Sequence, residues 1–237
     1  MKLHYNDKLI FLVLIMKTVI FDLDGTLVDT YMDLLNAGNL FYKSKNWNAT
    51  LDPEINKKTV INGGKSMIEY GLKNQKISYN KFTLNSLYPS FLSCYDKTIF
   101  NSSYLYDGIE DLLIKLKSEN WQIGLCTNKP EMQANMLLNK LKIRSYFNSF
   151  IGSDTLNIPK PNPEPLLKAI DILGGKVKNS VLVGDTITDR LTAKAAGTKS
   201  LLVNYGHGAL IEDLSYLEAD AMVNQPKEIS SVIESLI

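Results

Sequence analysis

The segment Thr-Val-Ile-Phe-Asp-Leu-Asp-Gly-Thr, residues 18–26, constrains the fold of this chain more than any other. Its first four residues are β-branched or aromatic, which predicts a short strand that is buried on both faces. Asp22 and Asp24 come next, and Gly25 allows the backbone to turn sharply away. We therefore expect a buried strand that ends at a pair of carboxylates.

Helices and strands alternate along the second half of the chain. Apolar residues recur at the spacing of one helix face in three segments, at about residues 109–116, 134–141 and 164–173. Short apolar strands are predicted around these helices, at residues 122–126, 149–151, 181–183 and 201–203. This alternation predicts an α/β fold with a Rossmann-like, doubly wound parallel sheet that helices cover on both faces.

The segment after the first strand has a different character. Residues 31–104 are polar, rich in Asn and Lys and helical in pattern, with a plausible helix start at Asp52-Pro53 and no convincing strand before Trp121. This predicts a small helical domain inserted after the first strand. The core domain then comprises residues 16–30 and 105–237, and residues 1–15 form an N-terminal extension. A length of 237 residues suits one core domain with a smaller insert.

Composition narrows the classes of partner and location. The net charge of +1 lacks the strongly basic surface of a nucleic-acid-binding protein. The cysteines, Cys94 and Cys126, form no CxxC motif, which favours the reducing cytoplasm. Residues 9–16 are apolar, but they are fewer than the ~20 that cross a bilayer, and no secretion cleavage site follows them. We expect a cytoplasmic monomer or homodimer without membrane or nucleic-acid partners, and Met16 is an equally good starting residue.

Polar residues stand just past four of the predicted strands, where ligands bind in parallel sheets. They are Asp22 and Asp24, Thr127 and Asn128, Lys160, and Asp185 with Asp189. Each has an ordinary structural explanation on its own, since Asp-Gly is a common turn and Asp185-Thr186 can cap a helix. Packing gives no reason for these acids, a Thr and a Lys to converge, so together they predict a catalytic site.

The chemistry of these residue types indicates phosphoryl transfer. Asp22 and Asp24 are two residues apart, so in an extended chain both side chains point into one pocket. One carboxylate can attack as a nucleophile while the other donates and then accepts a proton. Asp22 and Asp185 offer oxygen ligands for Mg²⁺, and Thr127 and Lys160 can stabilise phosphoryl oxygens.

Four ordered motifs carry a resemblance to a known family. They are Phe21-Asp-Leu-Asp-Gly-Thr-Leu-Val-Asp-Thr30, Cys126-Thr-Asn-Lys-Pro130, Lys160-Pro-Asn-Pro163, and Val183-Gly-Asp-Thr-Ile-Thr-Asp189 followed by Ala195-Ala-Gly197. Over about residues 17–237 the chain resembles the haloacid dehalogenase-like hydrolases, in their phosphoglycolate phosphatase-like branch. The resemblance implies that residues 31–104 are a cap domain.

The resemblance also implies roles for individual residues. It makes Asp22 the nucleophile that forms an aspartyl-phosphate, Asp24 the general acid and base, and Asp185 a Mg²⁺ ligand beside Asp22. The Asp24 backbone carbonyl and Asp189 would support the metal as well. Phosphate and substrate contacts are implied for a further set, namely Gly25, Lys65, Thr127, Asn128 and Lys160. Lys65 is explained equally well as a solvated surface lysine, and His207 as an ordinary loop histidine.

Three functions stay open at this stage. The first is a Mg²⁺-dependent phosphatase of a small phosphorylated metabolite, and the second is a sugar phosphomutase that resembles β-phosphoglucomutase. The third is a phospho-accepting receiver module, which is disfavoured because a receiver has no use for a general acid at Asp24. Phosphoglycolate, a nucleoside monophosphate, a sugar phosphate and pyrophosphate are all open as substrates.

Overall fold

The computed structural model describes residues 16–237, and the predicted N-terminal extension, residues 1–15, lies outside the described part. Six strands form one sheet in the order β5-β4-β1-β6-β7-β8, and every neighbouring pair is parallel. The strands are β1 Thr18–Phe21, β4 Gln122–Cys126, β5 Ser149–Ile151, β6 Ser180–Gly184, β7 Lys199–Val203 and β8 Ala221–Val223. After β1, the chain adds β4 and β5 on one side of it and then β6, β7 and β8 on the other side. This order confirms the predicted doubly wound sheet.

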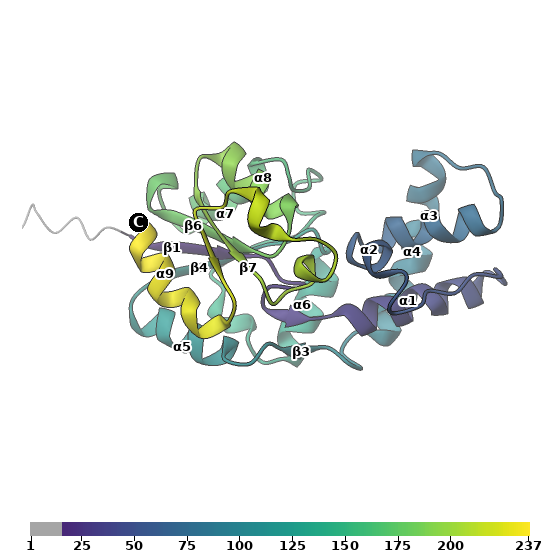
Figure 1. Ribbon diagram of the computed structural model, residues 1–237, viewed down its shortest axis with the longest axis horizontal. Helices are drawn as coiled ribbons and strands as arrows, with labels where there is room; N and C mark the ends of the chain where they lie inside the picture. The colour runs from purple at the N-terminus through teal and green to yellow at the C-terminus, as the bar shows by residue number, and fades with distance from the viewer. Residues whose placement is uncertain (1–15) are drawn as a thin grey trace, which may run out of the picture.

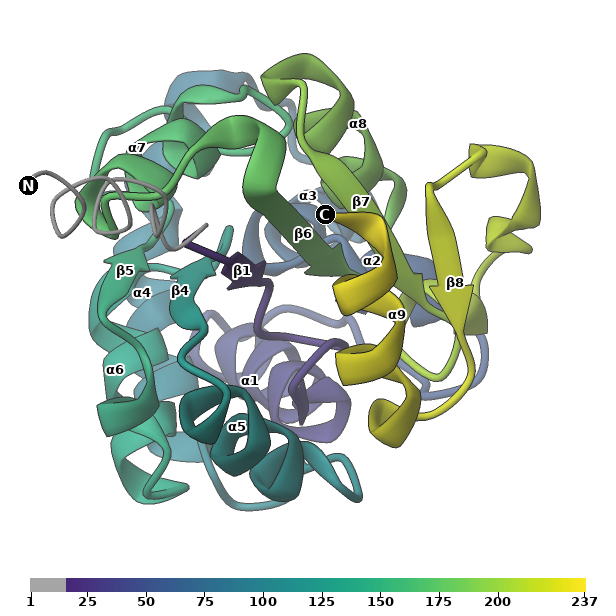
Figure 2. The same ribbon diagram turned by 90° about the vertical axis from the view of Figure 1, so that its left-hand side faces the viewer.

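Helices cover both faces of this sheet because the side chains of β1 alternate between two apolar clusters. Val19 and Phe21 belong to a large cluster with residues of three helices, α5 Ile109–Ser118, α6 Glu131–Lys140 and α9 Ile229–Leu236. Ile20 belongs to a smaller cluster with residues of two others, α7 Glu164–Ile172 and α8 Ile187–Ala196. Figure 2 shows these two sets of helices on opposite sides of the strands.

Four helices lie apart from the sheet, toward the right of Figure 1. They are α1 Tyr31–Ser44, α2 Lys57–Ile61, α3 Gly64–Asn74 and α4 Lys81–Thr98, and we call them the helical unit. Phe41, Tyr42, Met67 and Phe91 are almost fully buried within this unit, so it has an apolar core. None of the helices in residues 16–237 has the length and apolar character that a membrane crossing requires.

Two short connections between the sheet and the helical unit pair with each other. They are β2 Val28–Asp29 and β3 Tyr104–Leu105, which are antiparallel. The expectation of no strand before Trp121 is therefore wrong. Strands of two residues are too short to show the alternating pattern by which strands are recognised in a sequence.

The predicted helix start at Asp52-Pro53 is also wrong. The carboxylate of Asp52 accepts hydrogen bonds from the backbone N–H groups of Glu54 and Ile55, at 2.8 and 2.9 Å, within a turn. The helix begins only at Lys57. An aspartate satisfies the open N–H groups of a turn as well as those of a helix end, so the residue type alone does not distinguish them.

Candidate active site

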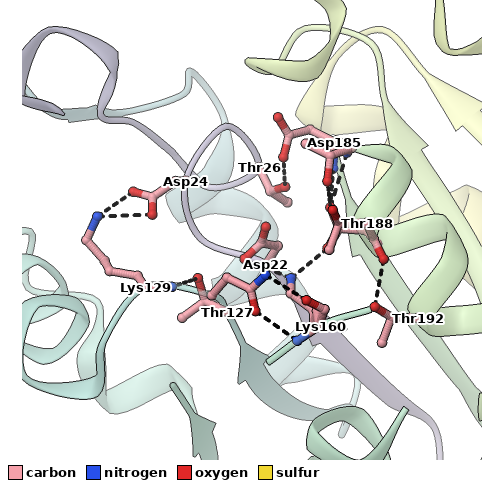
Figure 3. Close-up of polar contacts among 12 residues, drawn as sticks. Asp22, Asp24, Thr26, Thr127, Lys129, Lys160, Asp185, Thr188 and Thr192 are labelled. Carbon is pink, nitrogen blue, oxygen red and sulfur yellow. Dashed lines mark hydrogen bonds and ion pairs between the residues drawn. The ribbon is translucent and has the colours of Figure 1, made fainter. Parts of the chain in front are cut away.

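The predicted site residues come together at the carboxyl edge of the sheet (Figure 3). Asp22 directly follows β1, Thr127 follows β4, and Asp185 follows β6, while Lys160 lies in the loop after β5. The backbone N–H of Asp22 donates to the carbonyl of Val183 in β6, at 2.9 Å. The hydrogen bonds between β1 and β6 therefore extend one residue beyond β1 and fix the position of Asp22. The neighbouring strands therefore hold these side chains close together.

Lys160 forms the centre of a buried ion-pair group. Its Nζ lies 3.1 Å from Asp22 Oδ1 and 2.6 Å from Asp189 Oδ1, and its side chain is almost inaccessible to solvent. Burial disfavours the ammonium, but the charges of Asp189 and Asp22 outweigh burial and raise the pKa of Lys160 above its usual value. Lys160 therefore stays positively charged beside Asp22.

Asp185 is fully buried and held from two sides. Its oxygens accept hydrogen bonds from Thr26 Oγ1, at 3.2 Å, and from the backbone N–H of Gly208, at 2.9 Å. Gly25 packs against this carboxylate with a φ of +81°, and a Cβ at that position would collide with Asp185 Oδ2. The predicted Gly25 is thus needed for the turn and for close approach to Asp185.

Three carboxylates, those of Asp22, Asp185 and Asp189, each have an oxygen within 4.8 Å of the others. Burial, and then the charges of neighbouring carboxylates, raise the pKa of Asp22 and of Asp185. Asp22 Oδ1 is buried and accepts no hydrogen bond of normal geometry among the described residues. Crowded carboxylate oxygens of this kind fit a divalent cation such as Mg²⁺, which would favour their charged forms.

Asp189 differs from the other two acids because its oxygens have more partners. Oδ2 accepts from the hydroxyl of Thr186, at 2.7 Å, and from two backbone N–H groups, in the capping box that begins α8. Oδ1 contacts Lys160. Asp22 and Asp185 therefore have fewer partners than Asp189, which braces the loop and the lysine beside them.

Asp24 forms a second charged group with a residue that the sequence interpretation missed. Its carboxylate lies 2.7 and 3.0 Å from Lys129 Nζ and accepts a hydrogen bond from Thr30 Oγ1, at 2.7 Å. Burial opposes ionisation of Asp24, but Lys129 and Thr30 outweigh burial and lower its pKa. Lys129 lies two residues after Thr127, and in an extended chain this spacing places both side chains on the same face. This spacing could have identified Lys129 as a candidate site residue.

Thr127 and Asn128 play different parts in the structure. Thr127 is buried, and its hydroxyl oxygen accepts a hydrogen bond from the backbone N–H of Lys129, at 3.2 Å, so the hydroxyl proton is free to donate. Asn128 is exposed, and its amide bonds both to the N–H and to the carbonyl of Lys160, at 2.9 and 3.0 Å. Asn128 therefore ties together the loops that carry Thr127 and Lys160.

A cleft of about 710 Å³ lies between this edge of the sheet and the helical unit. Residues of both parts line it, among them Asp22, Asp24 and Thr127 from the sheet edge and Lys65 from the start of α3. Lys65 is exposed, and its Nζ lies 5.3 Å from the ring centroid of Tyr88. The structure thus places Lys65 at the cleft but away from the aspartates' hydrogen-bond network.

His207 is more constrained than an ordinary loop histidine. Only 3% of it is exposed, and its Nε2 lies 3.2 Å from Asp29 Oδ1. Its ring packs edge-on against Tyr31, the first residue of α1, with the ring centroids 6.1 Å apart. His207 therefore connects the loop after β7 to the connection that leads into the helical unit.

Known proteins resemble this chain in sequence. A family model described as haloacid dehalogenase-like hydrolase matches residues 19–203. A protein named phosphoglycolate phosphatase from Colwellia psychrerythraea is 35% identical over 194 residues, which cover 81% of this chain and 85% of that protein. Another of that name, from Chromobacterium violaceum, is 33% identical over 220 residues, covering 92% of this chain and 97% of its own.

Solved structures share the fold. A predicted phosphoglycolate phosphatase from Haemophilus somnus superposes with a TM-score of 0.82 at 24% identity, covering 92% of this chain and 97% of its own. CbbY from Rhodobacter sphaeroides, solved in complex with phosphate, superposes with a TM-score of 0.77 at 20% identity, covering 90% and 96%. At these identities the likeness concerns the fold alone.

Proposed function

Since this chain belongs to the haloacid dehalogenase-like hydrolases, in their phosphoglycolate phosphatase-like branch, and is a phosphoric monoester hydrolase, we propose a specific reaction for its site. It is a Mg²⁺-dependent phosphatase that hydrolyses a small phosphomonoester, with phosphoglycolate as the first candidate, through an aspartyl-phosphate on Asp22. The supporting observation is the convergence of Asp22, Asp24, Thr127 and Lys160 on one cleft.

In the first step Asp22 attacks the phosphorus of the ester, and the bond from phosphorus to the leaving oxygen breaks. Asp24 donates its proton to that leaving oxygen, so the product departs with a hydroxyl group rather than an alkoxide. In the free protein Asp24 is ionised, because Lys129 and Thr30 lower its pKa despite burial. The negative phosphoryl group of a bound substrate opposes this ionisation and favours the protonated form that the step requires.

In the second step Asp24, now a carboxylate, accepts a proton from a water molecule. That water attacks the phosphorus, the bond to Asp22 breaks, and inorganic phosphate leaves with Asp22 regenerated. Throughout, Lys160 and the hydroxyl of Thr127 stabilise the charge on the phosphoryl oxygens. Lys160 also holds Asp22 in place, since the two lie 3.1 Å apart.

The site is suited to a bound Mg²⁺, which Asp22, Asp185 and the backbone carbonyl of Asp24 would hold, with Asp189 as support. When bound, Mg²⁺ would offset the negative charge shared by the carboxylates and the phosphoryl group. The close approach of the three carboxylates and the raised pKa of Asp185 support this assignment.

In this proposal residues 31–104 act as a cap that closes the cleft over the substrate, and Lys65 contacts the leaving group. The pairing of β2 with β3 joins the two connections on which such a cap would move. The substrate is a small phosphorylated metabolite of the cytoplasm, and the enzyme acts as a monomer or a homodimer. Within residues 16–237 no observation favours the phosphomutase alternative specifically.

A phosphate-release assay of the purified protein tests the proposal. We expect turnover of phosphoglycolate with Mg²⁺, loss of activity in EDTA and recovery when Mg²⁺ is restored. Ca²⁺ should fail to replace Mg²⁺, because its coordination is longer and more variable. Sugar phosphates should be hydrolysed rather than isomerised. Full activity in the chelator would contradict the metal assignment, and an isomerised product would favour the mutase.

A further inference from the structure

Two buried polar side chains meet in the cleft beside Asp24. Lys129 follows β4 and is 6% exposed, whereas Tyr95 comes from α4 of the helical unit and is 2% exposed. Lys129 Nζ lies 4.6 Å from the centroid of the Tyr95 ring, and both residues line the cleft. The proposed mechanism gives neither of them a contact with the substrate.

The hydroxyl of Tyr95 lacks the partner that a buried phenol normally has. It makes no hydrogen bond of normal geometry among the described residues, although the ammonium of Lys129 lies nearby. An ammonium carries three N–H donors, and the two oxygens of Asp24 account for two of them. The third N–H of Lys129 therefore has no acceptor other than the Tyr95 oxygen, and the Tyr95 hydroxyl proton has no acceptor among the described residues.

The position of this pair suggests which part of a substrate supplies the acceptor. Asp24 must reach the leaving oxygen in order to protonate it, and Lys129 Nζ lies only 2.7 Å from Asp24 Oδ1. In a phosphorylated 2-hydroxy acid a single carbon separates the leaving oxygen from the carboxylate. Such a carboxylate therefore falls next to Asp24, where Lys129 and Tyr95 lie.

We propose that Lys129 and Tyr95 form a subsite for a carboxylate on the leaving group, and that they select phosphorylated 2-hydroxy acids over equally small neutral esters. The inference rests on the proposed function, because it assumes that the phosphoryl group lies at Asp22. A buried ammonium and hydroxyl discriminate strongly, since a substrate without the acceptor leaves both unpaired.

The test compares phosphoglycolate with 2-hydroxyethyl phosphate, which has a neutral hydroxymethyl group in place of the carboxylate. Tyr95→Phe removes only the unpartnered hydroxyl, so the variant should fold normally. We expect it to lower kcat/KM for phosphoglycolate by about tenfold, the effect of one hydrogen bond to a charged group, and to affect the neutral ester much less. Tyr70→Phe is the matched control, because Tyr70 lies on α3, does not line the cleft and should leave both rates unchanged.

Lys129→Met separates recognition of the substrate from support of Asp24. If Lys129 binds the carboxylate, the variant loses more activity on phosphoglycolate than on 2-hydroxyethyl phosphate. Equal losses on both esters, for Lys129→Met and for Tyr95→Phe, would overturn the subsite and leave Lys129 with a role through Asp24 alone.

A binding measurement separates failure of the subsite from failure of the proposed function. If the wild-type protein releases phosphate from neither ester, calorimetry on Asp22→Asn with Mg²⁺ compares the binding of the same two compounds. Tighter binding of phosphoglycolate that Tyr95→Phe abolishes would support the subsite although the proposed reaction fails. Equal affinity for the two compounds would reject the subsite.

Discussion

The start of α1 and the carboxyl edge of the sheet both bury aspartates, but they surround the negative charge in opposite ways. Asp33, in the first turn of α1, is fully buried and accepts hydrogen bonds from the backbone N–H groups of Phe100, Ser102 and Ser103, at 2.8 to 3.0 Å. The hydroxyl of Ser103 donates to it as well. At the sheet edge, Asp22 and Asp185 instead lie among other carboxylates.

This difference distinguishes a carboxylate that stabilises the fold from the carboxylates to which our proposal assigns a metal ion. The donors around Asp33 belong to the segment before β3, so its charge fastens the return connection to α1. At the sheet edge Lys160 pairs with Asp22 and Asp189, and among the ion pairs of the described residues no lysine contacts Asp185. A cation and a phosphoryl group would complete that region.

The largest expected effect comes from Asp22→Asn. Because an amide is a poor nucleophile, phosphate release should fall by about four orders of magnitude or more. Thermal unfolding without metal should show a stability equal to or above that of the wild type, since burial and neighbouring carboxylates disfavour the charge that is removed. Substantial remaining activity, or a marked loss of stability, would indicate that Asp22 has a structural role like that of Asp33.

The same substitution at the other region, Asp33→Asn, should have the opposite effect. An amide NH₂ would face donors that now bond to a carboxylate oxygen, and the free energy of unfolding should fall by about 3 kcal/mol. Urea unfolding measures this loss. At a temperature where the variant is folded, kcat/KM should stay within several-fold of the wild type. A variant that is stable but inactive would assign Asp33 to the site.

Mg²⁺ should stabilise the protein through the sheet-edge carboxylates, and this stabilisation should not depend on Asp33. A ligand at about 100 times its Kd raises the free energy of unfolding by about 2.7 kcal/mol, which a thermal shift detects. Asp185→Asn should lose most of this shift, whereas Asp33→Asn should keep it despite its lower melting temperature. A variant Asp185→Asn that fails to fold would instead favour a structural role for Asp185 at the start of α8.

The sequence predicted the sheet and its polar edge because both follow from local patterns. A strand such as β1 is apolar throughout, and the residue after it must lie at the sheet edge whatever the rest of the chain does. Residues 22, 127 and 185 could therefore be placed together from their positions alone, and Lys160 could be placed only in the loop after β5. The family resemblance then assigned them expected roles.

Contacts between distant segments could not be predicted in this way. Asp33 bonds to Ser103, 70 residues away, and Tyr95 meets Lys129 only because α4 packs over the loop after β4. No pattern in the residues around His207 predicts that it is buried. Such groups show no periodicity, and they become recognisable only when the folded chain shows which donors and acceptors face each other.

The smallest expected effect concerns the pair of Asp29 and His207, which links the two regions. Asp29 also accepts hydrogen bonds from the N–H of Tyr31 and the hydroxyl of Tyr104, so its surroundings resemble those of Asp33. The hydrogen bond from His207 has the largest effect on Asp29, and together these bonds outweigh burial and lower the pKa of Asp29. Burial favours neutral His207, but Asp29 and nearby carboxylates outweigh it and raise the pKa of His207 above 6.5.

A group whose pKa rises on folding stabilises the protein fully below its unfolded pKa and loses that contribution as the pH rises through its folded pKa. His207→Gln keeps a donor for Asp29 but removes the charge. In EDTA the free energy of unfolding of the variant should therefore be lower than that of the wild type by about 1 kcal/mol at pH 6. This difference should become smaller by pH 9. Urea unfolding at both pH values measures it. A difference that does not change with pH would mean that folding leaves the pKa of His207 unshifted, and a difference that grows with pH would mean that folded His207 is neutral.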